Sequence, residues 1–314
     1  MSYENMKHKQ HYVWRYYLSA WAVEDLVWCK RSNKYYQSNI KDVAQQRNFY
    51  KIHKLGKIEI ALLNECINKF QVSEDLKDIH RKIVELFSLP HSAQETIKLF
   101  SEINGATEEG NALAKKTFDV MINNLEEELH SDIESKSVDY LEDLKSETFE
   151  FWHDPSSRLN FLQFISLQLL RTKKIQQNLS EMTIEKMPAH SDSLMKIWNP
   201  LRHMLATNIA SNIFNSRFEI TLLLNETSTR FITSDQPAFN LFGTGLDRFD
   251  IPDEYAVYYP ITPSKAILID KGNGRSGSYT SFITPERASA YNQHVLAQHH
   301  EQLFARSKID LDQL

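Results

Sequence analysis

The sequence predicts an α+β protein in which a largely helical middle region packs with an antiparallel sheet. That sheet is expected to combine the C-terminal third with short N-terminal strands. Apolar residues recur at about four-residue spacing after Lys57 and alternate with period two after Phe218. The first spacing is typical of an amphipathic helix and the second of a half-buried strand. We expect one domain over 1–314, with short strands in 1–56, helices in 57–215, and a sheet with a closing helix in 216–314.

The N-terminal block is rich in aromatic side chains yet carries polar residues. His11 and Arg15 are four residues apart, so on a helix they would share one face. Residues 26–29 are apolar and 48–52 combine two aromatic residues with an isoleucine, which predicts two extended segments. A polar pair on an aromatic segment needs partners, and both residues are therefore candidates for a site.

Helical periodicity runs from Lys57 to Pro90 and again over 112–129. The glycine-containing stretch 104–110 separates these two parts and is expected to be a surface loop. The run from Glu126 to Asp154 is heavily acidic, and runs of charge mostly lie in water. We expect it to form a solvated helical face rather than a metal site.

Residues 159–170 are apolar on nearly all sides, which predicts a buried helix. Gln168 and Arg171 interrupt this apolar surface three residues apart. One interpretation is that Arg171 marks the point where the helix meets water. The other is that both side chains project into a polar cavity, because a buried guanidinium is costly unless carboxylates or hydrogen bonds satisfy it.

The C-terminal third contains successive strand patterns separated by turns, which favours an antiparallel sheet over βαβ units. Asp235 lies in the polar turn 233–237, directly after an apolar run and before a proline. A carboxylate in such a turn is a frequent place for chemistry in sheet proteins. Thr284 and Pro285 open a last helix, which is expected to run to Phe304. The four expected strands are 218–224, 230–233, 255–259 and 265–270.

Composition limits the partners. The formal net charge is −5, so no global field attracts nucleic acid, and contact with phosphates needs a local basic patch. The two cysteines form no CxxC or Cys/His array, so neither a disulfide framework nor a structural zinc site is indicated. The sequence has no signal peptide and no run of 18 apolar residues, and we therefore expect a cytoplasmic protein without a membrane partner.

Common catalytic and nucleotide-binding motifs are missing. The sequence has no GxxxxGK[ST], HExxH, GxSxG or DxDxDG. Residues 272–277 spell GxGxxG after an expected strand, but 278–282 looks extended rather than helical. A dinucleotide fingerprint needs a helix that starts within the glycines, so we interpret this stretch as a hairpin loop.

Five patches along the chain resemble a family known as domain of unknown function 4238 (DUF4238), found mainly in bacteria. Two departures stand out: Trp14 lies where proline is usual, and Gln236 replaces an asparagine. The resemblance marks as shared polar positions His11, Arg15, Glu59, Gln168, Arg171, Asp235 and Asn292. The matching patches are 10–18, 43–50 with Ile58-Glu59, 164–171, 232–237, and 259–263 with Asn292.

These residues lead to two hypotheses of function. In the first, the protein is a hydrolase that cleaves phosphodiesters of RNA or DNA in a bacterial defence or toxin setting. His11 acts as general acid or base and Asp235 orients it or activates water, while the arginines hold an anionic substrate. The substrate-binding candidates are Arg15, Gln168, Arg171, Gln236 and Asn292.

A weaker variant of the first hypothesis adds a divalent metal ion bound by Glu59 and Asp235, which would make Glu59 part of the catalytic set. In the second hypothesis the protein is a binding or regulatory module with a partner protein. The same residues then form a buried network of salt bridges, and removal of one member would unfold the chain because it leaves a buried charge without its partner.

Overall fold

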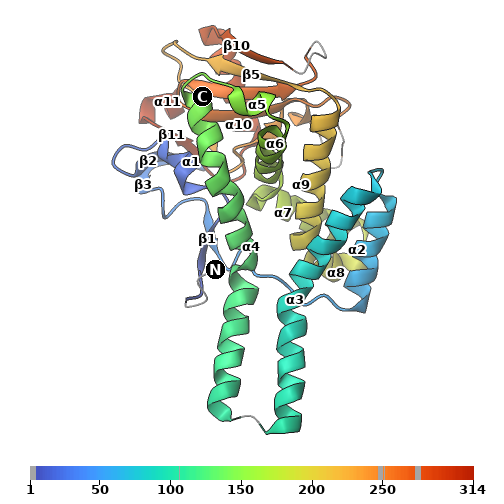
Figure 1. Ribbon diagram of the computed structural model, residues 1–314. Coiled ribbons are helices and arrows are strands. Elements are labelled where there is room, and N and C mark those ends of the chain that lie inside the picture. Colours follow the sequence, from blue (N-terminus) through green and yellow to red (C-terminus); the bar gives the residue numbers. More distant parts are fainter. Residues whose placement is uncertain (1–4, 106, 247–249, 251, 273–276) are drawn as a thin grey trace. The chain divides into compact units, whose positions relative to one another are not determined.

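The computed structural model of the protein describes residues 5–105, 107–246, 250, 252–272 and 277–314 (Figure 1). The chain divides into two compact units, which are described separately. Unit 1 comprises 1–10, 46–132 and 179–208, and unit 2 comprises 11–45, 133–178 and 209–314. In the described part, no helix combines the length and the apolar character needed to cross a membrane.

Helices dominate the middle of the chain and strands its two ends, which confirms the predicted α+β class. The helices are α1 (Arg15–Ser19), α2 (Lys57–Lys69), α3 (Glu74–Asn104), α4 (Glu108–Lys145), α5 (Glu150–His153), α6 (Pro155–Leu170), α7 (Lys173–Lys186), α8 (Ser191–Lys196), α9 (Trp198–Asn215), α10 (Pro285–Gln298) and α11 (Lys308–Asp312). The strands are β1 (Lys9–His11), β2 (Leu26–Arg31), β3 (Lys34–Asn39), β4 (Gln45–Arg47), β5 (Glu219–Leu224), β6 (Thr233–Ser234), β7 (Phe239–Asn240), β8 (Val257–Thr262), β9 (Lys265–Asp270), β10 (Ser278–Phe282) and β11 (Leu303–Ala305). Short 3-10 helices are η1 (Pro188–His190) and η2 (Leu241–Gly243).

Unit 1 is helical, and α3 and the first part of α4 form an antiparallel hairpin in it (Figure 1). Ser73 caps α3 by accepting a hydrogen bond from the Leu76 amide. Gly105 ends the helix at a φ of 68°, a conformation that glycine adopts without steric cost. The apolar faces of α3 and α4 meet around Phe87 and Ile122, and this core holds the hairpin together.

Proline does not end the helix in unit 1. The prediction that the helical pattern stops at Pro90 is wrong, because α3 continues to Asn104. An interior proline removes one backbone hydrogen bond, at a cost of about 3 kcal/mol. Residues on both sides of it, Phe87 and Ala93, pack in the same apolar core, and this packing holds the helix in place.

The larger sheet lies in unit 2 and has the strand order β10-β5-β9-β8-β7. Its strands β5 and β9 match the sequence prediction closely. The sheet is mixed rather than antiparallel throughout, because β10 pairs with β5 in parallel while the other neighbours are antiparallel. The predicted buried helix is confirmed as α6, with Asp154 as its N-cap and Pro155 in its first turn.

A second sheet in unit 2 joins the two ends of the chain, in the order β3-β2-β11-β6. Its strand β11 pairs with β2 on one side and with β6 on the other. The last long helix ends at Gln298 rather than at Phe304, and Phe304 belongs to β11. Thr284 caps that helix, α10, as predicted. The sheet therefore places the turn after β6 next to residues close to the C-terminus.

The predictions for residues 48–52 and 272–277 have different outcomes. Residues 48–52 do not form a strand, because β4 ends at Arg47 and Asn48 turns the chain with a φ of 53°. The glycine-containing motif 272–277 lies partly outside the described residues, at 273–276. The strand predicted after it is present as β10.

Candidate functional site

His11 and Arg15 do not share a helix face, so that prediction is wrong. His11 is the last residue of β1, whereas Arg15 is the first residue of α1 and is exposed. Trp14 between them is extended, with φ of −62° and ψ of 130°, which separates the two elements. The His11 ring contacts the Lys41 carbonyl through Nε2 at 3.1 Å.

Arg171 is buried in unit 2 and paired with a carboxylate. Its Nη1 forms an ion pair with Glu134, and its Nη2 donates to the His11 carbonyl at 2.7 Å. Arg171 and Glu134 are 2% and 5% exposed, and Gln168, one turn earlier, is also buried. Arg171 therefore does not mark the point where the helix meets water. It is a buried guanidinium whose charge is satisfied by a carboxylate and hydrogen bonds.

Asp235 is held by backbone amides. Its carboxylate accepts hydrogen bonds from the amides of His300, Glu301 and Gln302 at 2.8, 2.8 and 3.1 Å. Burial raises the pKa of Asp235, and these hydrogen bonds oppose the shift. The carboxylate thus closes the turn between α10 and β11.

Gln236, Asn292 and Glu59 also bond to neighbouring backbone or hydroxyl groups. Gln236 Nε2 donates to the carbonyls of Leu169 and Ala238 at 3.2 and 2.7 Å. Asn292 accepts from the Ile232 amide at 3.1 Å and donates to the Arg230 carbonyl at 2.8 Å. In unit 1, Glu59 accepts from the Gly56 amide at 3.0 Å at the start of α2, and the Ser193 hydroxyl donates to it at 2.7 Å.

A denser group of polar side chains, none of them among the candidates from the sequence, lies inside unit 1. Glu126 and His130 are one turn apart on α4, and Asn199, Arg202 and His203 share a face of α9. We call these five residues the Glu126 cluster. Glu126 and Arg202 have no exposed surface, His130 is 1% exposed, and Asn199 and His203 are each 6% exposed.

The cluster converges on one carboxylate oxygen. Arg202 donates to Glu126 Oε1 from Nε at 3.0 Å and from Nη2 at 2.5 Å. The Nε2 atoms of His203 and His130 lie 3.2 and 3.4 Å from the same oxygen. The other oxygen, Oε2, accepts from the Asn199 amide. The two imidazole rings stack at a centroid distance of 5.2 Å.

These contacts keep the carboxylate ionised. Burial by itself would raise the pKa of Glu126, but Arg202 and the two imidazoles hold it well below its usual range. The guanidinium lies over the rings of Tyr50 and Trp198, at 5.3 and 5.6 Å. Its Nη1 is buried and has no hydrogen-bond partner among the described residues.

The prediction of a solvated acidic face over 126–154 is wrong for Glu126 and Glu134, because both are buried against arginines. A signal for the cluster was present in the sequence. Arg202 and His203 are the ionisable residues of α9 and lie next to each other near its start. Their partner could not be found, because the spacing along the chain does not pair α4 with α9.

A metal ion is a second use for this donor set. Ligand atoms of Glu126, His130 and His203 lie within 4.8 Å of one another, and two imidazoles with one carboxylate form a known metal-binding set. Arg202, however, already neutralises the carboxylate. Adding a divalent cation beside the guanidinium would leave a net buried charge, which is unfavourable. The donor set therefore fits the hydrogen-bonded cluster better than a metal ion.

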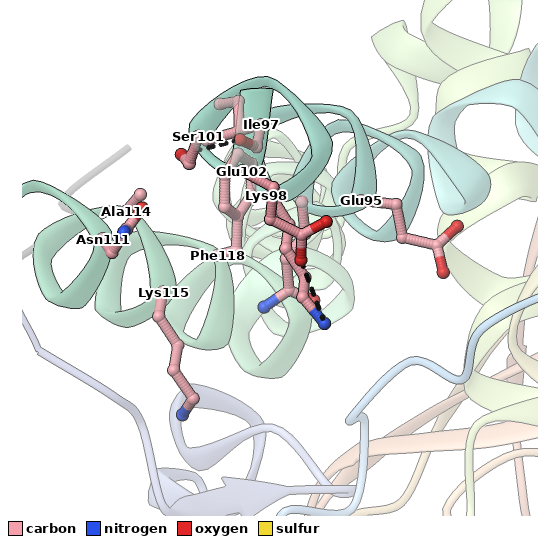
Figure 2. Close-up of a pocket in the computed structure, with 10 residues that line it drawn as sticks. Glu95, Ile97, Lys98, Ser101, Glu102, Asn111, Ala114, Lys115 and Phe118 are labelled. Atoms are coloured by element: carbon pink, nitrogen blue, oxygen red, sulfur yellow. Dashed lines mark hydrogen bonds and ion pairs between the residues drawn. The ribbon is translucent and has the colours of Figure 1, made fainter. Parts of the chain in front are cut away.

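A groove of about 620 Å³ lies between α3 and α4 in unit 1 (Figure 2). Its polar groups pair with one another: the Ser101 hydroxyl donates to the Ile97 carbonyl at 2.8 Å, and Lys98 lies 4.0 Å from Glu102. Figure 2 shows these pairs within the α3 side of the groove. They leave the groove with less capacity for acid–base chemistry than the Glu126 cluster.

The fold and these contacts define an α+β protein with a buried carboxylate–imidazole–guanidinium cluster. A family model described as protein of unknown function (DUF4238) matches residues 9–309, and the chain belongs to this family. Searches of curated proteins and of solved structures gave no match.

Proposed function

We propose that the protein is a hydrolase that cleaves phosphodiester bonds of nucleic acid, with the Glu126 cluster as its catalytic centre. The observation that carries this proposal is the convergence of two imidazoles and one guanidinium on Glu126 Oε1. Imidazole titrates near neutral pH and so transfers protons in both directions. A guanidinium matches the charge and geometry of a phosphate.

Each member then has a role. Glu126 Oε1 accepts from His203 Nε2, which fixes the proton on that nitrogen and leaves Nδ1 of His203 as the basic nitrogen. His203, with 6% of its surface exposed, takes the proton from the attacking oxygen. His130 in its protonated form gives a proton to the leaving oxygen. After turnover His203 releases its proton to water and His130 takes one up from water, which returns both imidazoles to their starting states. Arg202 Nη1 stabilises the negative charge on the phosphate.

A local basic segment next to the cluster supports nucleic acid as the substrate. Residues 47–57 contain four lysines or arginines and no acidic residue. Lys51, His53 and Lys54 in this segment are exposed. Tyr50, in the same segment, packs its ring on His130 at 4.7 Å. Phosphates bound by the lysines would therefore lie close to the imidazoles.

A second candidate function follows from the contacts in unit 2. Asp235 bonds three backbone amides and Asn292 bridges two backbone groups of residues 230–232. Such contacts favour a structural network, as in a binding module without catalytic activity. The alternative assignment has His11 and Asp235 as catalytic residues in unit 2. It is tested separately, by substitution of these two residues.

The experiment compares purified wild type, His203→Ala and His11→Ala on end-labelled RNA and DNA, with exposed His190→Ala as the matched control. We expect the His203 variant to lose about 10²- to 10⁴-fold in rate, the usual contribution of one general acid or base. The melting temperature of each variant separates lost chemistry from lost folding. Full activity of His203→Ala, or no cleavage by the wild type, would contradict the proposal. Loss in His11→Ala alone would move the site to unit 2.

A further inference from the structure

A cleft of about 530 Å³ opens in unit 2 beside the turn that carries Asp235 and Gln236. It lies where the end of α6, the start of α7, β7 and the end of α10 come together. This volume is within the range of small-molecule sites, and the walls are mainly apolar, with Leu169, Ile175 and Phe239 among them. The cleft has no role in the chemistry proposed for unit 1.

Three hydrogen-bond donors line the cleft. Lys174 Nζ donates to the carbonyl and the side-chain oxygen of Gln298 at 2.7 and 2.9 Å. An ammonium has three donors, so a third remains within the described structure. Asn178 follows one turn later on the same face of α7. The Tyr255 hydroxyl is buried and has no partner among the described residues.

Other polar groups of the cleft are already occupied. The Gln236 amide donates both of its hydrogens to backbone carbonyls, and the Asn240 side-chain oxygen accepts from two backbone amides. The carboxylates of Asp235 and Asp250 near the cleft differ in their surroundings. Asp235 bonds backbone amides, and Asp250, which lines the cleft, is exposed. The available groups are thus donors, and one of them is cationic.

We propose that this cleft binds a small organic anion, with a carboxylate or phosphate against Lys174 and an apolar body against Leu169 and Phe239. Ammonium, phenol and carboxamide donors together suit an anionic acceptor. The apolar walls suit the rest of such a molecule. The site is independent of phosphodiester cleavage in unit 1 and stands even if that function fails.

The test uses pyridoxal 5′-phosphate, an aromatic phosphate whose aldehyde forms an imine with a lysine amine as water leaves. Borohydride then reduces the imine, and mass spectrometry locates the label. Burial lowers the pKa of Lys174, and the carboxylate of Asp235 opposes the shift. We expect Lys174 to react faster than exposed Lys271, because the cleft would hold the phosphate of the reagent close to the Lys174 amine. Equal rates at the two lysines would overturn the proposal.

Competition identifies the anion. Benzoate and phenyl phosphate present the two anionic groups, and benzyl alcohol is the uncharged control. If either anion but not the alcohol protects Lys174 from labelling, the site is supported. The anion that protects better identifies whether a carboxylate or a phosphate is preferred. Protection by neither anion overturns it.

A matched pair of variants tests the donors without removing the amine. Tyr255→Phe should weaken protection about tenfold, the loss expected for one hydrogen bond to a charged group. Exposed Tyr279→Phe should have no effect. Melting temperatures of both variants show that unit 2 is intact. Unchanged protection in Tyr255→Phe would exclude the hydroxyl from the site and contradict the donor set.

Discussion

Arg202 donates two hydrogen bonds, from Nε and Nη2, to a single oxygen of Glu126, at 3.0 and 2.5 Å. Both side chains are fully buried. Two opposite charges are therefore enclosed together, and each is tolerated in the interior only because of the other.

Glu126→Gln should destabilise unit 1 strongly. The substitution keeps the size of the side chain but leaves the buried guanidinium without its charge partner, which costs about 3–5 kcal/mol. Denaturant unfolding of wild type and variant measures the difference. Glu128→Gln, two residues away and partly exposed, is the matched control and should change stability by less than about 0.5 kcal/mol. Equal stability of the two variants would contradict the conclusion that Glu126 stabilises the buried charge of Arg202.

The same carboxylate makes stability depend on pH. The folded-state pKa of Glu126 is well below its ordinary value of 4.5, so its contribution is present above pH 4.5 and is lost as the pH falls towards the folded-state pKa. The stability difference between wild type and Glu126→Gln should shrink across that window. Asp235 has the opposite effect on the pH dependence of stability, because burial raises its pKa above the ordinary value of 3.8. A difference that stays constant down to about pH 3 would contradict the assigned shift.

Asp235→Asn distinguishes a structural from a catalytic carboxylate in unit 2. An asparagine turns an amide nitrogen towards backbone amides that need an acceptor, which costs about 1–3 kcal/mol for each donor left unsatisfied. We expect lower stability, measured by thermal and denaturant unfolding, with exposed Asp253→Asn as control. Unchanged stability together with lost activity would instead support the catalytic assignment to Asp235.

The sequence predicted elements better than partners. The apolar pattern located α6, β5 and β9, since each element's periodicity is a local property. The parallel pairing of β10 with β5 is set by tertiary contacts and left no local trace. Glu126 was misjudged for a related reason, because a run of charge does not reveal that one member meets an arginine 76 residues away. For Arg171 the sequence left two interpretations open, and the carboxylate of Glu134 that pairs with it lies 37 residues away in the chain.

Lys51→Ala should weaken nucleic-acid binding in a salt-dependent manner. Losing one phosphate contact reduces the slope of log affinity against log salt by about 1. Filter binding or fluorescence anisotropy over a range of salt concentrations measures this slope. Lys115→Ala removes a lysine elsewhere in unit 1 and should leave the slope unchanged. If the two variants behave alike, segment 47–57 is not the contact surface.

Chelation should leave cleavage intact. Because Arg202 already balances Glu126, the proposed chemistry needs no divalent ion at the cluster. Activity and melting temperature after treatment with EDTA measure this directly. If activity disappears and returns with Mn²⁺ or Zn²⁺, the metal-binding use of Glu126, His130 and His203 would replace the acid–base mechanism.

Strand β11 has a consequence for the order in which the protein is made. It lies between β2 and β6 in their sheet, yet it comprises residues 303–305, which follow both of these strands in the sequence and leave the ribosome after them. Until then β2 and β6 lack the neighbour that joins them, and the amides that hold Asp235 have not been synthesised. This sheet of unit 2 must therefore assemble after residues 303–305 have been synthesised, and truncation before residue 303 should leave the nascent strands with open edges that favour aggregation.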